Sequence, residues 1–321
     1  MGKPWPVLGF EPDMPVQQSL EQIIRARLQE FFSQYDAAMR TGDPEAVHQA
    51  RVSIRRIQTV GKVFPAHFHA KRLTKILDHL RAFHRALGTV RASDVAVERL
   101  EMRIEGITAP DPRGALLLAG QMHVRRQESF KNMKREWKGL SRQVIEEKIL
   151  ASVRSPKRKK EKPHLLLPFR DAAAGVYPDL FSSFLESYAP VLDHPNATKQ
   201  FHAARLKGKR LRYLMEVCVS FTPKEFGVLL EELKEVLRSF GEVNDIDLQL
   251  ELYRSSRRQI ARYNRSVAAG QKLPVDIFTT LTALEREERT RTFEKLRTGY
   301  ARLRERQKPG RAMFGERRTE G

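Results

Sequence analysis

The chain has 321 residues and a net charge of +20, because 59 Lys and Arg residues outnumber 39 Asp and Glu residues. A field of that sign concentrates polyanions and disfavours a cationic ligand, so nucleic acid, anionic lipid and polyphosphate remain open as partners. The single cysteine, Cys218, excludes an intramolecular disulfide and a cysteine-rich zinc site, and it fits a reducing compartment.

No apolar run reaches the ~18 residues that a transmembrane helix requires. The stretch from Met1 to Val16 holds four prolines and two acidic residues, and it lacks the apolar core of a signal peptide. We therefore expect a cytoplasmic protein without membrane insertion. The sequence leaves the oligomeric state open.

Helical periodicity runs through the first half of the chain. Between Val16 and Arg40, apolar residues recur at the spacing of one helix face. Asp43, directly before Pro44, has the form of a helix N-cap, and Gly88 is expected to end a later helix. The expected helices cover residues 16–40, 44–63, 69–87, 93–106 and 111–150.

A basic stretch divides the chain. Residues 154–163, RSPKRKKEKP, contain two prolines and no apolar residue, which predicts an exposed linker. The chain therefore divides into an N-terminal helical half (1–152), a basic linker (153–164) and a C-terminal helical half (165–321).

The second half repeats the helical order. Thr222 and Glu225 have the spacing of a capping box that opens a helix, and Gly241 is expected to end that helix. The expected helices cover residues 170–188, 197–219, 222–240, 244–269 and 274–306, with a break at 190–196 and a frayed tail from residue 309.

Two motifs occur once in each half, in the same order. The first is HQARVSIRRIQT from His48 and HAARLKGKRLRY from His202, an offset of 154 residues (202 − 48). The second is LRAFHRALGTVRASD from Leu80 and LKEVLRSFGEVNDID from Leu233, an offset of 153 (233 − 80). Two matched motifs at nearly one offset indicate an internal duplication.

On a helical wheel the first motif separates charge from the core. His48, Arg51 and Arg55 fall on one side, and Ile57 and Phe64 fall on the other. The second copy places His202, Arg205, Lys209 and Arg212 opposite Leu211, Leu214 and Cys218. Arg and Lys are the side chains that bind phosphate oxygens, so each stripe is a candidate phosphate-binding face. A solvated charged face is the plainer interpretation, and the lack of interspersed acidic residues weakens it.

The second motif adds smaller basic clusters on the following helices. Arg81 with Arg85 and Lys234 with Arg238 form these clusters, but Asp78 and Glu231 lie one turn away and could pair with them. The aspartates of this motif are placed at expected helix starts, where they would cap helices or orient nearby arginines: Asp94, Asp245 and Asp247.

Together these motifs resemble the CHAD family, named for histidines in an α-helical domain. The resemblance covers about residues 16–306 and rests on H-x-x-R-[VL]-x-x-[RK]-R-[IL] in each half, followed by L-G-x-x-[RN]-D-x-D. Gln58, Ala92 and Phe240 depart from the usual pattern. The resemblance implies an all-α fold of two four-helix-bundle-like halves, related by approximate two-fold internal symmetry, with the basic helices facing a shared cleft. It also implies binding of inorganic polyphosphate and association with polyphosphate granules.

The phosphate-binding residues that the resemblance implies follow the motifs in each half. They are His48, Arg51, Arg55, Arg56, Arg81 and Arg85, and then His202, Arg205, Lys209, Arg210, Arg212, Lys234 and Arg238.

The sequence disfavours catalysis. It contains no G-x-x-x-x-G-K-[ST] phosphate loop and no His-Asp dipeptide of the metal phosphohydrolase type. The closest match to the E-x-E-x-K strand motif of tunnel triphosphatases begins at Glu285, in a helical stretch, and lacks the lysine. His67 and His69 have no acidic partner in register for a metal ion. We expect a non-enzymatic binding protein with no catalytic residue, metal site or cofactor.

Nucleic-acid binding is the main alternative, because contacts to a phosphate backbone would use the same cations. Sequence-independent binding of single strands needs exposed aromatic rings beside the basic stripe. Tyr213 is the aromatic residue placed to stack in this way. Inorganic polyphosphate has no bases, so a stripe nearly free of aromatic residues favours it.

Overall fold

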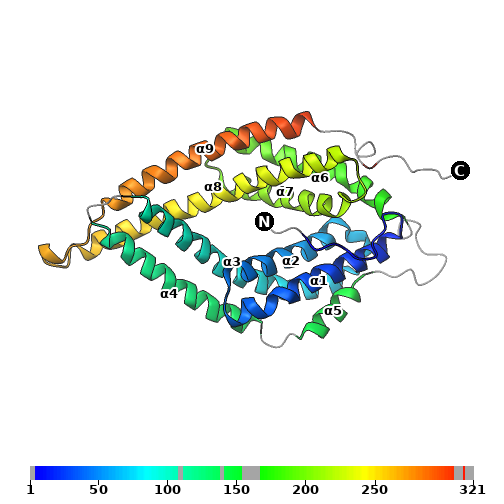
Figure 1. Ribbon diagram of the computed structural model, residues 1–321, viewed down its shortest axis with the longest axis horizontal. Coiled ribbons are helices and arrows are strands. Elements are labelled where there is room, and N and C mark those ends of the chain that lie inside the picture. Colours follow the sequence, from blue (N-terminus) through cyan, green and yellow to red (C-terminus); the bar gives the residue numbers. More distant parts are fainter. Residues whose placement is uncertain (1–3, 108–110, 138–140, 154–166, 307–313, 315–321) are drawn as a thin grey trace.

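The computed structural model is all-helical across the residues it describes, 4–107, 111–137, 141–153, 167–306 and 314 (Figure 1). This confirms the predicted fold class. The nine α-helices of this part of the chain are α1 (Val16–Arg40), α2 (Pro44–Val63), α3 (Ala70–Glu105), α4 (Arg113–Glu136), α5 (Arg142–Leu150), α6 (Phe169–Asp193), α7 (Thr198–Cys218), α8 (Lys224–Tyr263) and α9 (Ile277–Glu305).

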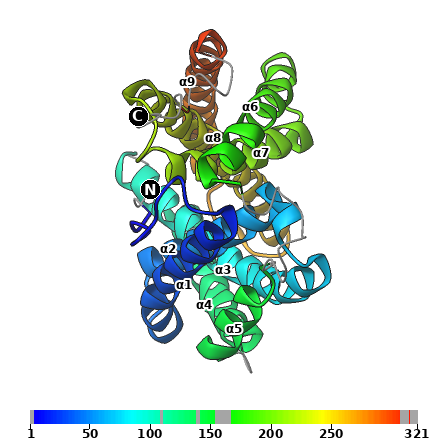
Figure 2. The same cartoon turned by 90° about the vertical axis from the view of Figure 1, so that its right-hand side faces the viewer.

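Helices that follow one another in the chain pack side by side. In the first half α1 packs on α2, α2 on α3 and α3 on α4; in the second half α6 packs on α7, α7 on α8 and α8 on α9. The halves meet where α2 contacts α7 and where α3 contacts α8. Figure 2 shows this division end-on, with α6–α9 on one side and α1–α5 on the other.

Buried apolar side chains join the two halves. The main core cluster includes Phe31 and Leu80 from the first half together with Leu233 and Phe240 from the second. A smaller cluster at the far end of the long helices unites residues of α3, α4, α8 and α9. The halves therefore share buried surface, and the proposed boundaries at residues 152 and 165 stay a prediction.

The two glycines that were expected to end helices do not. α3 continues through Gly88 to Glu105, and α8 continues through Gly241 to Tyr263. Both predictions were wrong because glycine in a helix has a modest energetic cost, which packing along these long helices outweighs.

Other helix boundaries also differ from the sequence expectation. The predicted helix 111–150 consists of α4 and α5, and Ser141 caps α5 by accepting a hydrogen bond from the Val144 amide (3.2 Å). α6 runs beyond the predicted break at Pro190, to Asp193. Thr222 forms no capping box, because its hydroxyl donates to the Cys218 carbonyl instead (3.1 Å). The Asp43 cap is confirmed by its bond from the Ala46 amide (2.7 Å).

The basic linker after residue 153 and the tail from residue 309, as the sequence defines them, lie outside the described residues, apart from residue 314. In the part of the chain that the structure describes, no helix combines the length and the apolar character needed to cross a membrane.

Candidate anion-binding site

A cleft of about 470 Å³ lies between α2, α3, α7 and α8. Both copies of the first motif reach it, because α2 and α7 face each other where the halves meet. Eight cationic side chains line the cleft: Arg51, Arg55, Arg91, Arg99, Arg205, Lys209, Arg212 and Arg238. Its walls also carry two carboxylates, those of Glu242 and Asp245, and the imidazole of His48.

Four cations at the centre of this group form no ion pair with any described residue: Arg51 and Arg55 of α2, and Arg205 and Lys209 of α7. The Nε atoms of Arg51 and Arg205 are buried and have no hydrogen-bond partner among the described residues. Buried donors are normally satisfied, so these two guanidinium nitrogens, at equivalent motif positions, are free to donate to an acceptor from outside the described residues.

A glycine of the second motif lies beside each of these arginines. A Cβ atom added to Gly88 would lie 3.2 Å from the Nε atom of Arg51. A Cβ atom added to Gly241 would lie 3.8 Å from an Nη atom of Arg205. Glycine at position 88 thus lets Arg51 pass close to the α3 backbone, whereas at Gly241 a Cβ atom would meet Arg205 at an ordinary van der Waals distance.

Burial and mutual repulsion destabilise the positive charge in the free cleft. Burial, followed by the fields of Arg55 and Arg205, lowers the pKa of Arg51 to about 10. The pKa of Lys209 is also well below its ordinary value, for burial first and then the neighbouring arginines. Both shifts have the sign expected of a cation cluster that lacks a counter-charge.

Two histidines stay neutral for the same reasons. Burial and then the charge of Arg91 lower the pKa of His48 to about 4. Burial and then the charges of Arg55 and Arg51 lower the pKa of His84 to about 2, and its buried Nε2 atom has no described hydrogen-bond partner.

A repeated clamp fixes the start of each motif helix. Arg126 of α4 donates to Asp94 of α3 (2.6 Å) and to the carbonyl of Gly42, just before α2. In the second half, Arg289 of α9 donates to Asp247 of α8 (2.7 Å) and to the carbonyl of Pro195, just before α7 (2.7 Å). Asp94 and Asp247 therefore orient arginines, which is one of the two roles predicted for them.

The other predicted role of these aspartates, helix capping, was wrong. Asp94 lies inside α3, and Asp245 and Asp247 lie inside α8, because neither helix ends at its glycine. The repeated clamp accords with an internal duplication, while the approximate two-fold symmetry itself stays a prediction.

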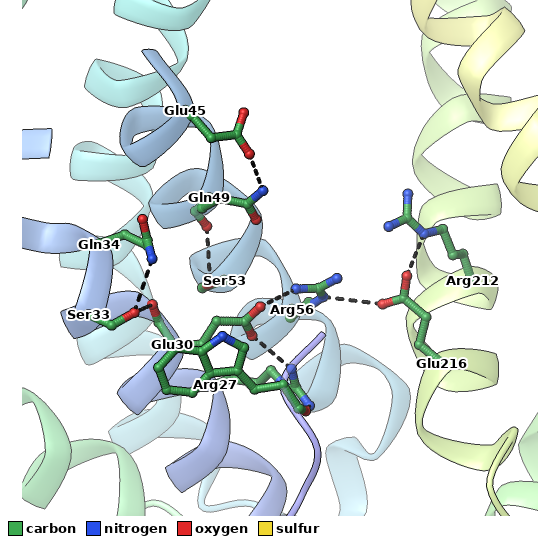
Figure 3. A network of polar contacts seen from close by, with 11 residues as sticks. Arg27, Glu30, Ser33, Gln34, Glu45, Gln49, Ser53, Arg56, Arg212 and Glu216 are labelled. Atoms are coloured by element: carbon green, nitrogen blue, oxygen red, sulfur yellow. Dashed lines mark hydrogen bonds and ion pairs between the residues drawn. The ribbon is translucent and has the colours of Figure 1, made fainter. Parts of the chain in front are cut away.

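Two predicted phosphate-binding residues lie in a buried network of ion pairs, and of the two only Arg212 was placed on a basic stripe. Arg56 donates to Glu30 (2.6 Å) and to Glu216 (3.2 Å), and Arg212 donates to Glu216 (2.7 Å; Figure 3). Arg56 does not line the cleft. Arg212 does, with its side chain only 2% exposed. The sequence interpretation did not include Glu216, which pairs with Arg212 from one turn further along α7, nor the carboxylates of α1 and α7 that bind Arg56.

The remaining predicted residues lie around the cleft. Arg81 pairs with Asp78 and Lys234 with Glu231 (2.7 Å), which confirms the predicted pairing. His202 is exposed at the start of α7. Arg210 adds positive charge beside Lys62, whose pKa is lowered by burial first and then by this charge. Arg238 lines the cleft, whereas Arg85 lies in a separate hollow between α3 and α4.

Three residues at or near the cleft were not predicted from the sequence. Arg91 and Arg99 line the cleft from α3, and His84 lies in the field of the central cations. Arg91 stands inside the second motif, so the motif could have indicated it. His84 has Leu237 at the equivalent position of the second half, so the duplication gave no signal for it.

These features define an all-helical domain with a cationic cleft between its halves. A family model described as the CHAD domain matches residues 22–254, and the chain belongs to this family. The comparison with curated protein sequences found no match.

Two solved structures share the fold. The crystal structure of the CHAD domain from the plant Ricinus communis is similar with a TM-score of 0.70 and 19% identity, over 94% of this chain and 96% of that chain. PptA from Streptomyces chartreusis is similar with a TM-score of 0.62 and 19% identity, over 89% of this chain and 99% of that chain. At this identity the likeness shows the fold alone.

Proposed function

We propose that the protein binds inorganic polyphosphate in the cleft between α2 and α7. The observation that carries this proposal is the group of four central cations, from both motif helices, that form no ion pair with a described residue: Arg51, Arg55, Arg205 and Lys209. A densely charged phosphate chain would supply the missing negative charge and accept hydrogen bonds from the orphaned Nε atoms. The volume of about 470 Å³ is within the range of ligand-binding pockets.

The surroundings of Tyr213 favour polyphosphate over RNA. The ring is only 7% exposed, and the guanidinium carbons of Arg56 and Arg212 lie 5.7 Å and 5.4 Å from its centroid. A ring covered in this way offers no face for a base to stack on. The single aromatic residue that supported the nucleic-acid alternative is therefore committed to contacts within the protein.

A direct comparison tests the proposal. The protein is titrated with long-chain polyphosphate and with single-stranded RNA at equal phosphate concentration and equal salt. We expect tighter binding of polyphosphate. If RNA displaces bound polyphosphate under these conditions, the nucleic-acid alternative replaces the proposal.

The proposal assigns binding without a reaction. The central side chains of the cleft supply positive charge and hydrogen-bond donors, which suit retention of an anion. After prolonged incubation with the protein, polyphosphate should keep its length on a gel, and shortening of the chain would reject this part of the proposal. Association with polyphosphate granules follows from such binding and can be checked by imaging a fluorescent fusion beside stained granules.

A further inference from the structure

A chain of buried ion pairs lies behind one wall of the cleft and joins the two halves. Arg56 of α2 donates to Glu30 of α1 (2.6 Å) and to Glu216 of α7 (3.2 Å), and Arg27 donates to Glu30 (2.7 Å; Figure 3). Glu216 also accepts from Arg212 (2.7 Å). None of these five side chains is more than 4% exposed. Because water and salt screen such pairs little, they hold their geometry firmly.

Glu216 occupies the junction of this chain. Its Oε2 atom accepts from the first half, through Arg56, and its Oε1 atom accepts from Arg212 in the second half. Arg212 lines the anion cleft, while Arg56 and Glu216 line a small pocket on the far side of Tyr213. One carboxylate therefore accepts hydrogen bonds from a guanidinium that lines the cleft and from a guanidinium of the facing helix α2.

Tyr213 stiffens the same junction. Its ring lines both the cleft and the small pocket, and both arginines that bind Glu216 lie within 6 Å of its centroid, at 5.7 Å for Arg56 and 5.4 Å for Arg212. Cations over an aromatic face are attracted to it, most strongly where water is excluded. Rotation of either guanidinium would cost this contact as well as an ion pair.

We propose that Glu216 is a positioning residue, which holds the basic faces of α2 and α7 at the spacing that lets one long phosphate chain contact both. This inference rests on the proposed polyphosphate function. A long chain that touches both helices gains effective concentration from the second contact, and this gain depends on a fixed distance between the helices. A short phosphate that touches one helix does not need that distance.

Two variants with the same change in charge test the proposal. Glu216→Gln and Glu231→Gln each remove one negative charge, but Glu231 is exposed and pairs with Lys234 outside the cleft. If charge alone set affinity, both variants would bind a polyanion as tightly as the native protein or more tightly. Positioning predicts the opposite sign for Glu216→Gln.

We expect Glu216→Gln to weaken long-chain polyphosphate binding at least about tenfold while leaving triphosphate binding nearly unchanged. Glu231→Gln should leave both affinities close to native. Long-chain binding by folded Glu216→Gln that equals or exceeds native binding would overturn the proposal.

A second variant covers the case in which Glu216→Gln does not fold. Removing one partner of a buried ion pair is strongly destabilising, because the other charge stays buried without a counter-charge. Arg56→Met combined with Glu216→Gln removes both charges of the link between α2 and α7, while the Gln amide oxygen can still accept a hydrogen bond from Arg212 and Glu30 keeps its pair with Arg27. This double variant should therefore fold and show the same selective loss of long-chain binding. Native long-chain affinity in this folded double variant would also overturn the proposal.

A distance measurement separates this inference from the proposed function. Spin labels are attached to Asp36→Cys on α1 and Glu186→Cys on α6, two exposed positions in different halves, while native Cys218 is buried. Without ligand, Glu216→Gln should shift or broaden the distance distribution between the labels. An unchanged distribution overturns the positioning role, whereas failure of the native protein to bind polyphosphate overturns only the function on which it rests.

Discussion

Replacing Arg51 with methionine should stabilise the free protein while weakening its binding of polyphosphate. The guanidinium of Arg51 has a buried Nε atom without a described hydrogen-bond partner, and it lies among the like charges of Arg55 and Arg205. Methionine keeps an unbranched apolar side chain at this position and removes the charge. The variant therefore tests separately how the charge of Arg51 affects the stability of the free protein and how it affects polyphosphate binding.

The shift in pKa sets the size of the effect. The pKa of Arg51 falls from 12.5 to about 10, and one pKa unit corresponds to ~1.36 kcal/mol. Because the folded-state pKa is the lower one and both values exceed 7, the full penalty applies at neutral pH. The ceiling is therefore about 3 kcal/mol, and we expect a rise of about 1–3 kcal/mol in the free energy of unfolding once salt screening is included.

Urea unfolding in a phosphate-free buffer measures this rise, and titration with long-chain polyphosphate measures the loss of affinity. Arg85→Met is the control, because Arg85 is exposed and lies outside the cleft; its stability should stay within ~0.5 kcal/mol of native. A folded Arg51→Met variant that is less stable than the native protein would refute the argument that the buried charge of Arg51, among like charges, destabilises the free protein.

Three further outcomes follow from the site. The free protein should lose stability as the pH falls below ~6.5, because the pKa values of His48 (about 4) and His84 (about 2) are lowered in the folded state and the unfolded chain therefore binds more protons. Urea unfolding at two pH values measures this loss, and a free energy of unfolding that does not change with pH would contradict the prediction. Polyphosphate affinity should fall steeply between low and physiological salt in a titration series, and an affinity independent of salt would reject the electrostatic account. Gly241→Ala should stabilise α8 by about 0.5–1 kcal/mol and leave polyphosphate binding native, whereas Gly88→Ala should displace Arg51 and weaken that binding. Equal polyphosphate affinity of the two variants would show that the close contact at Gly88 has no role in binding.

Local patterns in the sequence were enough to place the motif helices. The limits of α2, the Asp43 cap and the burial of Ile57 and Leu211 were predicted correctly, and the limits of α7 were predicted to within one residue. Helical periodicity and capping depend on residues within a few positions of one another, so a single chain carries this information. The duplicated motifs added the family and, through it, the fold class.

The same local reasoning failed where a glycine served a distant side chain. Gly88 and Gly241 have the form of helix ends, but each lies beside an arginine of the neighbouring motif helix. Helix propensity measures the cost of such a glycine, and only the packed structure reveals that the side chain of Arg51 leaves little room for a Cβ atom at Gly88.

The sequence by itself determined that α2 and α7 carry a basic face and an apolar face. Only the tertiary structure decided which cations on those helices are left for a ligand. Arg51 and Arg205 have no described ion-pair partner, whereas Arg56 binds Glu216, 160 residues further along the chain. The energy of a buried charge depends on the carboxylates and the amount of water around it in the folded state. Those neighbours come from other helices, so the spacing of residues along one helix cannot specify them.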